Sequence, residues 1–331
     1  MAGEFGTRFL PQMMIASFDG KWGSERMVDS NSITLHPGAH VFHYASTCFE
    51  GLKAFRQRDG SVAIFRMEQN VARFAQSTRL LCLPDLDTEQ TSRMIVEAVR
   101  YYQDHVPDSP ASLYIRPTHI GTEPAIGKAA ARSETSIQYI LLSPVGDYFA
   151  SGEACLRLLL DDVGVRCGPD HGMVKGGGNY ASALKHIERA KREVQADQVL
   201  FCPAGNVQET GAANFILLDG KQIITKSLDE SFLHGVTRDS LLTLVRNKGM
   251  DVQERELDIE ELLERASRPD CEAGLTGTAA VVAAVGTLIY QGKEYSIGSG
   301  KAGPKIRQMR EELNAIQWGL AEDTHQWMTR I

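Results

Sequence analysis

Residues 173–184 read MVKGGGNYASAL: a single lysine, three glycines, an Asn-Tyr pair and the start of a helical pattern. Glycine lets a backbone approach a ligand closely, but it also forms ordinary turns. A lysine amine forms a Schiff base with a carbonyl compound when it is accessible and aligned. The stretch therefore indicates either a plain turn or a site built around Lys175.

The motif GGGNYA at 176–181 also fits G-x-G-x-x-A, the dinucleotide fingerprint of many oxidoreductases. That fingerprint follows an apolar strand, and its ribose-binding acid comes after the next strand. The preceding RCGPDHGMVK contains no apolar strand, and Asp197 comes before the next strand-like run. An oxidoreductase is therefore an alternative that the context does not favour.

The composition is that of a globular protein. The chain has 331 residues, of which 43% are hydrophobic and 23% charged, enough for two domains. Its net charge of −7 and the absence of a basic block argue against nucleic acid and membrane partners. The six cysteines form no CxxC and no metal-ligand spacing, so we expect reduced thiols, no metal site and a cytoplasmic protein.

Hydrophobic periodicity predicts mixed α and β structure. Strands are expected at 62–67, 137–142 and 155–160, helices at 67–81, 180–194, 237–248 and 258–265, and a β-rich meander at 198–226. In the helix at 180–194, we expect an apolar face made of Ala183, Leu184, Ile187, Ala190 and Val194. The uncharged run 273–290 is rich in Ala, Gly and Thr, which favours a strand, a turn and a further apolar element over a membrane span.

A cluster of turn-forming residues sets the expected domain limits. Pro, Gly, Asp and Ser separate the strands at 137–142 and 155–160. We therefore predict an N-terminal domain at 1–143, a linker at 144–152 and a C-terminal domain at 153–331.

Seven blocks together resemble a known family. In chain order they are HYASTCFEGLKAF, AIFRMEQNVARF, LYIRPTHIGTEPAIG, VKGGGNYASAL, QETGAANFILL, LHGVTRDSLL and LTGTAAVV. They resemble the branched-chain aminotransferases, which are class IV, or fold-type IV, pyridoxal-phosphate enzymes, from about residue 18 to 318. The resemblance implies a two-domain α/β (α+β) fold, with an N-terminal α/β domain and a C-terminal β-barrel-like domain with helices.

The resemblance also implies roles in binding pyridoxal 5'-phosphate. Lys175 would carry the cofactor as an aldimine and, once released, move the proton as the catalytic residue. Glu209 would face the ring nitrogen and Tyr180 the phenolic oxygen. The phosphate would be bound by Arg66, Val236, Thr237 and Thr278. Read singly, these residues also fit a surface ion pair, a turn, a helix cap or core filler.

The substrate residues follow from the same resemblance. Tyr114, Thr278 and Ala279 would hold the α-carboxylate, and Arg116 the distal carboxylate of glutamate or 2-oxoglutarate. The apolar side-chain pocket would be formed by Tyr44, Phe49 and Tyr148. A homodimer or higher homo-oligomer is expected, in which Tyr44 and the loop GTEPAIGKAAA approach the neighbouring subunit's pocket. Lys128 departs from the small apolar residue of relatives, so it either favours polar substrates or points to solvent.

The expected reaction is ping-pong transamination from L-leucine, isoleucine or valine to 2-oxoglutarate. A D-amino acid aminotransferase or an aminodeoxychorismate lyase would share Lys175 and Glu209, so these residues do not separate the activities. The blocks LYIRPTHIGTEP and FEGLKAF favour the branched-chain group. A non-catalytic interaction protein is the remaining alternative class.

Overall fold

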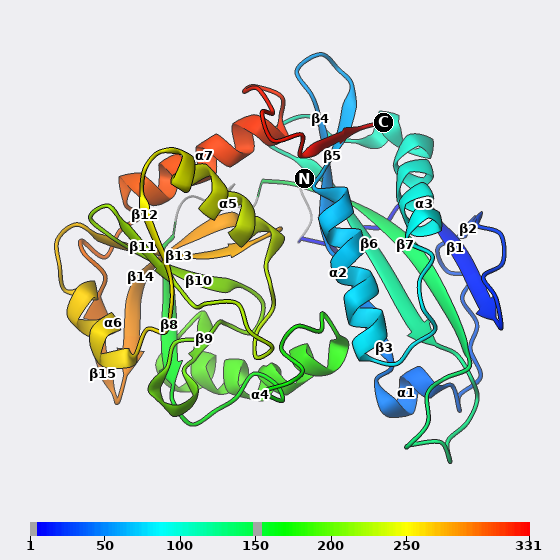
Figure 1. The fold of residues 1–331 in the computed structure, drawn as a ribbon, viewed down its shortest axis with the longest axis horizontal. Helices are drawn as coiled ribbons and strands as arrows, with labels where there is room; N and C mark the ends of the chain where they lie inside the picture. Colours follow the sequence, from blue (N-terminus) through cyan, green and yellow to red (C-terminus); the bar gives the residue numbers. More distant parts are fainter. Residues whose placement is uncertain (1–4, 148–153) are drawn as a thin grey trace. The chain divides into compact units, whose positions relative to one another are not determined.

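The computed structural model describes residues 5–147 and 154–331, which divide into two compact units (Figure 1). Unit 1 comprises Met1–Ala150, Val174–Gly177 and Ala315–Ile331; unit 2 comprises Ser151–Met173 and Gly178–Asn314. Val174–Gly177 and Ala315–Ile331 group with unit 1 in this division, and the domain limits at 143 and 153 stay a prediction.

Unit 1 is built on an antiparallel sheet. Its strands are β1 (Gln12–Asp19), β2 (Arg26–Asp29), β3 (Thr47–Phe49), β4 (Leu52–Arg56), β5 (Val62–Phe65), β6 (Ser112–Gly121), β7 (Thr135–Val145) and β16 (Met328–Arg330). They lie in the order β16-β5-β4-β6-β7-β1-β2, with β3 paired to β6. The strand predicted at 137–142 is confirmed by β7.

Two helices, α2 (Met67–Leu80) and α3 (Thr88–Tyr101), cover one face of this sheet, and Figure 1 shows them running beside the strands. The short helix α1 (His40–Tyr44) precedes β3. Leu113 and Ile115 of β6 share a buried core with Val71 of α2 and Met94 of α3. Because side chains alternate along a strand, Tyr114 and its neighbours at even positions face the other side of the sheet.

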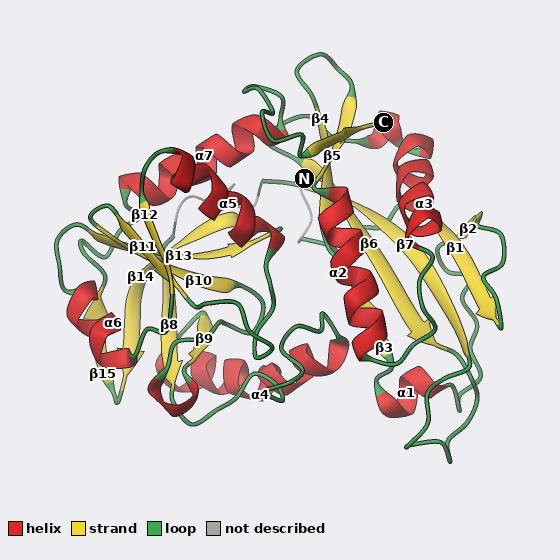
Figure 2. Cartoon of the chain, viewed as in Figure 1, coloured by secondary structure: helices red, strands yellow, loops and turns green. Residues whose placement is uncertain are grey.

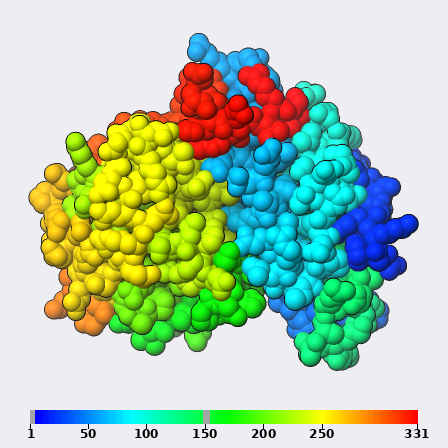
Figure 3. Space-filling view, viewed as in Figure 1, coloured from blue at the N-terminus to red at the C-terminus, as the bar shows by residue number. Residues whose placement is uncertain are grey.

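The C-terminal residues complete this sheet at its edge. Strand β16 pairs with β5, and the backbone N–H of Arg66 donates to the carbonyl oxygen of Trp327 at 2.7 Å. Figure 3 shows the C-terminal residues, coloured red, against the part of the surface formed near β4 and β5. The last residues of the chain thus pack around the start of α2.

Unit 2 contains a second, mixed sheet. Its strands are β8 (Leu156–Asp161), β9 (Gln198–Phe201), β10 (Asn214–Asp219), β11 (Gln222–Thr225), β12 (Asp251–Glu254), β13 (Cys271–Gly277), β14 (Val281–Tyr290) and β15 (Lys293–Ser296). The order is β12-β11-β10-β13-β14-β8-β9, with β15 paired to β14. Strand β8 is parallel to β9 and β14, and β11 is parallel to β12. The run 273–290 is β13, a turn and β14, as predicted.

The helices that lie mostly in unit 2 are α4 (Gly177–Val194), α5 (Val236–Asn247), α6 (Ile259–Ala266) and α7 (Pro304–Gln317). Figure 2 shows α4 near β9, and Ala183 and Ala190 of this helix pack with Val199 and Phe201 of that strand. The expected apolar face of α4 is wrong at one position, because Leu184 is 56% exposed. Leu184 follows the buried Ala183 directly, and that step turns its side chain away from the sheet.

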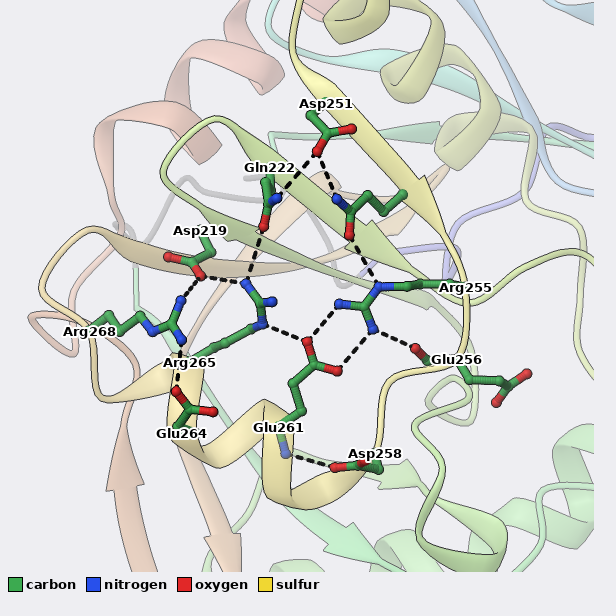
Figure 4. A network of polar contacts seen from close by, with 11 residues as sticks. Asp219, Gln222, Asp251, Arg255, Glu256, Asp258, Glu261, Glu264, Arg265 and Arg268 are labelled. Carbon is green, nitrogen blue, oxygen red and sulfur yellow. Dashed lines mark hydrogen bonds and ion pairs between the residues drawn. The ribbon is translucent and has the colours of Figure 1, made fainter.

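An ion-pair network joins α6 to the end of β10 (Figure 4). Arg265 donates to Asp219 at 2.6 Å and to Glu261 at 2.7 Å, and Arg255 also binds Glu261. The guanidinium of Arg255, followed by that of Arg265, lowers the pKa of Glu261 to about 2. These charges therefore hold the short helix α6 against the sheet.

Within the described ranges, no helix is both long and apolar enough to cross a membrane. No group of three or more His, Cys, Asp and Glu in these ranges has the arrangement of a metal site. All six cysteines, which lie in the described part of the chain, are free.

One buried histidine makes the stability of unit 1 depend on pH. His119 of β6 is fully buried, with Thr78 Oγ1 at 3.2 Å and Ser136 Oγ at 2.8 Å from its ring nitrogens. Burial lowers the pKa of His119 from 6.5 to about 3, because the charged ring would lose its hydration. Between these two pH values the unfolded chain binds a proton at His119 that the folded protein does not.

We therefore predict that the free energy of unfolding falls as the pH decreases from 6.5 towards about 3. Replacing His119 by Gln keeps hydrogen-bonding groups but removes the titration, so the slope of the unfolding free energy against pH is expected to fall by up to roughly 1.4 kcal/mol per pH unit. Urea denaturation at several pH values measures the effect, with the exposed His105→Gln as the control. An unchanged slope in His119→Gln would contradict the prediction.

Candidate active site

Lys175 is held in unit 1 by its own backbone. Its N–H donates to Ser77 Oγ of α2 at 3.0 Å, and its carbonyl oxygen accepts from Phe49 N at 3.0 Å. Gly176 forms a bridge with Cys48, so the lysine segment runs antiparallel to β3. The side chain is half-buried, and Nζ lies 5.2 Å from the centre of the Phe49 ring. Strand β3 and helix α2 thus fix where the amine is presented.

The glycines after Lys175 allow this close backbone approach. A Cβ on Gly176 would lie 3.3 Å from the carbonyl oxygen of Thr47, and one on Gly177 would lie 3.3 Å from Thr47 Cγ2. Helix α4 already begins at Gly177. The first two glycines therefore serve the packing of the lysine segment against β3.

A cavity of about 340 Å³ opens on the face of the unit 1 sheet that the helices leave uncovered. Three of the predicted substrate residues, Phe49, Tyr114 and Arg116, line it. The other lining residues are Phe5, Gly6, Phe9, Thr118, Tyr139, Leu141 and Ser143. The registers of β6 and β7 explain this set, because Tyr114, Arg116 and Thr118 pair with Ser143, Leu141 and Tyr139.

The cationic and aromatic groups of this cavity contact one another. The Arg116 guanidinium stacks 4.5 Å from the centre of the Phe49 ring, and its Nη2 donates to the Tyr114 hydroxyl at 2.9 Å. Gly51 is needed here, because a Cβ at this position would lie 2.1 Å from the Tyr114 oxygen. Arg116 and Tyr114 thus form one preorganised donor group above Phe49.

Tyr139 is a residue of the cavity wall that our sequence reasoning missed. Burial raises the pKa of its phenol, so near neutral pH the group is a hydrogen-bond donor. The alternation of side chains along β7 showed which residues share a face with Tyr139. Only the register between β7 and β6 shows that this face lines the cavity. Thr118 and Ser143 were missed for the same reason.

Arg66, predicted to bind phosphate, lies at the start of α2. Its backbone is in the left-handed region, with φ 48° and ψ 44°, and its guanidinium lies 5.1 Å from the centre of the Trp327 ring. Left-handed backbone is costly for residues with a side chain and persists where the surroundings enforce it. The contacts with Trp327 enforce it here, which fixes the direction in which the arginine leaves the helix.

The remaining predicted residues of unit 1 lie elsewhere. Tyr44 ends α1, and its hydroxyl donates to the carbonyl oxygen of Ile126; it does not line the cavity. Lys128 forms an exposed ion pair with Glu123 at 2.6 Å, so its charge is matched at the surface. Tyr148 lies outside the described residues.

Unit 2 holds Glu209 as a buried carboxylate that is 2% exposed. Its Oε1 accepts from Leu233 N at 2.9 Å and lies 2.7 Å from Arg166 Nη1, and its Oε2 accepts from Asn214 Nδ2 at 3.1 Å. A buried charge is tolerated only when it is paired and hydrogen-bonded, and this one is both. No local pattern had indicated Arg166, because the RCGPDHG stretch has the polar character of a surface turn.

The other predicted residues of unit 2 lie at two backbone features. Helix α5 begins at Val236, its N-cap Gly235 offers no side-chain acceptor, and Thr237 is buried in the first turn. Thr278 and Ala279 form the turn between β13 and β14, and Val281 directly after it has φ 61°. Such a backbone is rare for a β-branched residue and is often found at functional sites. Tyr180 is half-buried in the first turns of α4.

Comparison with known proteins identifies the class. Residues 47–285 match the model of the family described as Amino-transferase class IV, so the chain belongs to this family. It is 35% identical to the branched-chain-amino-acid aminotransferase 2 of Bacillus subtilis (strain 168), over 99% of this chain and 92% of that protein.

Solved structures agree with this assignment. The T.th. branched-chain amino acid aminotransferase with pyridoxamine 5'-phosphate superposes with a TM-score of 0.77 at 26% identity, over 96% of this chain and 97% of that chain. The same protein in complex with N-(5'-phosphopyridoxyl)-L-glutamate gives 0.75 at 25% identity, with the same coverage. The predicted fold class is therefore confirmed.

The residues present fit the pyridoxal-phosphate cofactor of this family. Unit 1 offers an amine at Lys175 and an arginine at Arg66. Unit 2 offers the buried anion of Glu209 and the amide groups at the start of α5, where no side chain caps the helix. An aldehyde needs an amine, a pyridine N–H needs an anion, and a phosphate suits a helix N-terminus and an arginine.

A second buried carboxylate follows Phe49 directly in the chain. Glu50 is 1% exposed, and Arg73 of α2 binds it through Nε at 2.7 Å and Nη2 at 2.8 Å. We predict that Arg73→Met costs about 3–5 kcal/mol in the free energy of unfolding, because it leaves an uncompensated buried charge.

The double variant E50Q/R73M should recover part of that loss in chemical denaturation, because no charge is then left unpaired. The exposed pair of Arg100 and Glu97 provides the control, and Arg100→Met is expected to cost less than about 1 kcal/mol. If Arg73→Met and Arg100→Met lower the free energy of unfolding by the same amount, the buried ion pair contributes no more to stability than the exposed one.

Proposed function

We propose that this protein is a pyridoxal-phosphate-dependent branched-chain L-amino acid aminotransferase. It transfers the amino group of leucine, isoleucine or valine to 2-oxoglutarate in a ping-pong reaction. The observation that carries the proposal is that Lys175 Nζ and the Arg116 guanidinium contact the same Phe49 ring, which lines the cavity of unit 1. The Bacillus subtilis relative bears the same activity in its name.

Lys175 would hold the cofactor through its amine, and the same amine would move a proton at the substrate Cα. Bound pyridoxal phosphate supplies an electron sink for the charge that develops at that carbon. Glu209 would balance the ring N–H, and Tyr180 would donate to the phenolic oxygen. Arg66, Thr278 and the N-terminal amides of Val236 and Thr237 would hold the phosphate.

The cavity of unit 1 explains how one site takes two kinds of side chain. With a branched donor, Phe49 and Leu141 pack on the alkyl group, while Arg116 keeps its stacking and its bond to Tyr114. With 2-oxoglutarate, the guanidinium and the protonated Tyr139 phenol offer donors to the distal carboxylate. Arg116 therefore never needs to be a buried charge without a partner.

The substrate α-carboxylate is held by Tyr114 and by the turn that contains Thr278 and Ala279. Tyr114 is suited to this task because Gly51 lets its hydroxyl sit against the backbone. The bound phosphopyridoxyl-L-glutamate compound of the T.th. relative supports a site for an L-amino acid on the cofactor.

We also propose that the protein forms a homodimer through the surface around α1. Phe42 and Ile126 are 61% and 67% exposed, and the bond from Tyr44 to Ile126 ties the helix to that loop. Exposed apolar side chains that lie near each other are typical of subunit interfaces. Tyr44 would then contact the site of the neighbouring subunit.

A panel of amino donors with 2-oxoglutarate tests the activity. We expect L-leucine, L-isoleucine and L-valine to yield glutamate, measured by an enzyme-coupled assay, and D-alanine to yield none. Formation of D-glutamate from D-alanine, detected by chiral chromatography, would instead indicate a D-amino acid aminotransferase. Cleavage of aminodeoxychorismate without amino transfer would indicate a lyase.

Lys175 is tested by chemical trapping of the cofactor. After borohydride reduction of the loaded protein, peptide mass mapping should find the cofactor on Lys175. In Lys175→Ala it should find no modified lysine, and the transamination rate should fall by roughly 100-fold or more. The exposed Lys185→Ala on α4 is the matched control, and the melting temperatures show whether both variants fold. Cofactor on another lysine in the unmodified sequence would overturn the assignment.

A further inference from the structure

The carboxylate of Glu209 is held from two sides by groups of unit 2. Oε1 receives the N–H of Leu233 at 2.9 Å and lies 2.7 Å from Arg166 Nη1. Oε2 receives Asn214 Nδ2 at 3.1 Å, and the same Asn214 nitrogen donates to the carbonyl oxygen of Leu233. With both Arg166 and Leu233 on Oε1, the orientation of the carboxylate plane is fixed.

Arg166 is buried to an unusual degree for an arginine, with 1% of its surface exposed. Besides Glu209, Nη1 makes long contacts to the carbonyl oxygen of Gly172 at 3.4 Å and to Cys167 Sγ at 3.6 Å. Within the described residues, its Nε has no hydrogen-bond partner. Burying a guanidinium so incompletely satisfied is costly, so its short contact with Glu209 is what compensates the burial.

The chain brings Arg166 to Glu209 through a tight packing contact. A Cβ on Gly172 would lie 1.9 Å from the carbonyl carbon of Ser231 and 2.2 Å from the nitrogen of Phe232. The loop that carries Arg166 is therefore pressed against the backbone just before Leu233. Both donors to Oε1 consequently come from segments that pack on each other.

We propose that Arg166 is a positioning residue that keeps Glu209 as a fixed anion facing the ring nitrogen of the bound cofactor. Arg166 acts through Glu209 and does not itself touch the cofactor. A buried carboxylate that loses its cation takes up a proton, and it then no longer balances a protonated ring nitrogen. This inference rests on the proposed function, since it requires a pyridine ring at Glu209.

The test loads the full chain with pyridoxal phosphate labelled with ¹⁵N in the ring and records its nitrogen resonance. The wild-type ring nitrogen should be protonated, and Glu209→Gln gives the reference for the unprotonated ring. Arg166→Met should move the resonance towards that reference. It should also slow conversion of the cofactor by L-leucine about 10- to 100-fold, with the KM for L-leucine nearly unchanged.

Arg166→Lys keeps the charge but not the planar fork, so its resonance and rate should lie between those of wild type and Arg166→Met. If Arg166→Met does not fold, Arg166→Lys carries the test through the same two measurements. The matched control is Arg265→Met, which removes an arginine from the ion pairs with Asp219 and Glu261 in the same unit (Figure 4). Its melting temperature should fall while its ring nitrogen stays protonated.

Two results separate the possible failures. If the Arg166 variants keep the wild-type resonance and rate and lose only thermal stability, as Arg265→Met does, Arg166 has a structural role and the inference is overturned. If the wild-type protein binds no labelled cofactor, the proposed function itself fails, and the inference fails with it.

Discussion

Each unit contains a carboxylate that water does not reach, and the structure around it depends on an arginine that compensates its charge. Glu50 in unit 1 is 1% exposed and Glu209 in unit 2 is 2% exposed, and each is paired with an arginine at 2.7 Å. An isolated charge at such depth would be expelled or neutralised, and the backbone around it would rearrange. Glu50 adjoins Phe49, whose N–H holds the carbonyl oxygen of Lys175. The presentation of the lysine therefore depends indirectly on the guanidinium of Arg73.

Two residues with a strained backbone lie at or near proposed cofactor or substrate residues. Arg66 and Val281 both have left-handed φ angles; Arg66 is itself a proposed phosphate-binding residue, and Val281 lies two positions after Ala279, a proposed substrate residue. For Arg66, the packing that accompanies this conformation comes from Trp327, which is distant in the sequence. A left-handed backbone costs stability locally, and it sets the direction in which the side chain leaves the backbone.

Local patterns predicted much of the fold, whereas long-range pairing did not follow from them. The turn chemistry and periodicity around 62–81 and 236–248 indicated α2 and α5, because caps and apolar spacing act within a few residues. The placement of Val174–Gly177 and Ala315–Ile331 in unit 1 depends on contacts with β3 and β5, which no local pattern encodes. Leu184 shows the same limit, since apolar spacing does not say which side of a helix finds a partner.

Within the candidate site, Phe49, Tyr114 and Arg116 were identifiable because they stand in blocks that resemble those of a known family. Tyr139 and Arg166 were not identifiable, because what singles out each of them is a neighbour on another segment of the chain.

The cysteines have a practical consequence. Burial raises the pKa of Cys48 to about 12 and that of Cys271 to about 11, and it also raises the pKa of Cys155, Cys167 and Cys202. Cys82, just beyond the end of α2, is the one cysteine with an exposed side chain among the six that the structure describes. A maleimide dye would therefore attach first at the end of the helix whose Ser77 holds the lysine segment. The natural sequence thus provides a fluorescent reporter position beside the candidate site without any cysteine engineering.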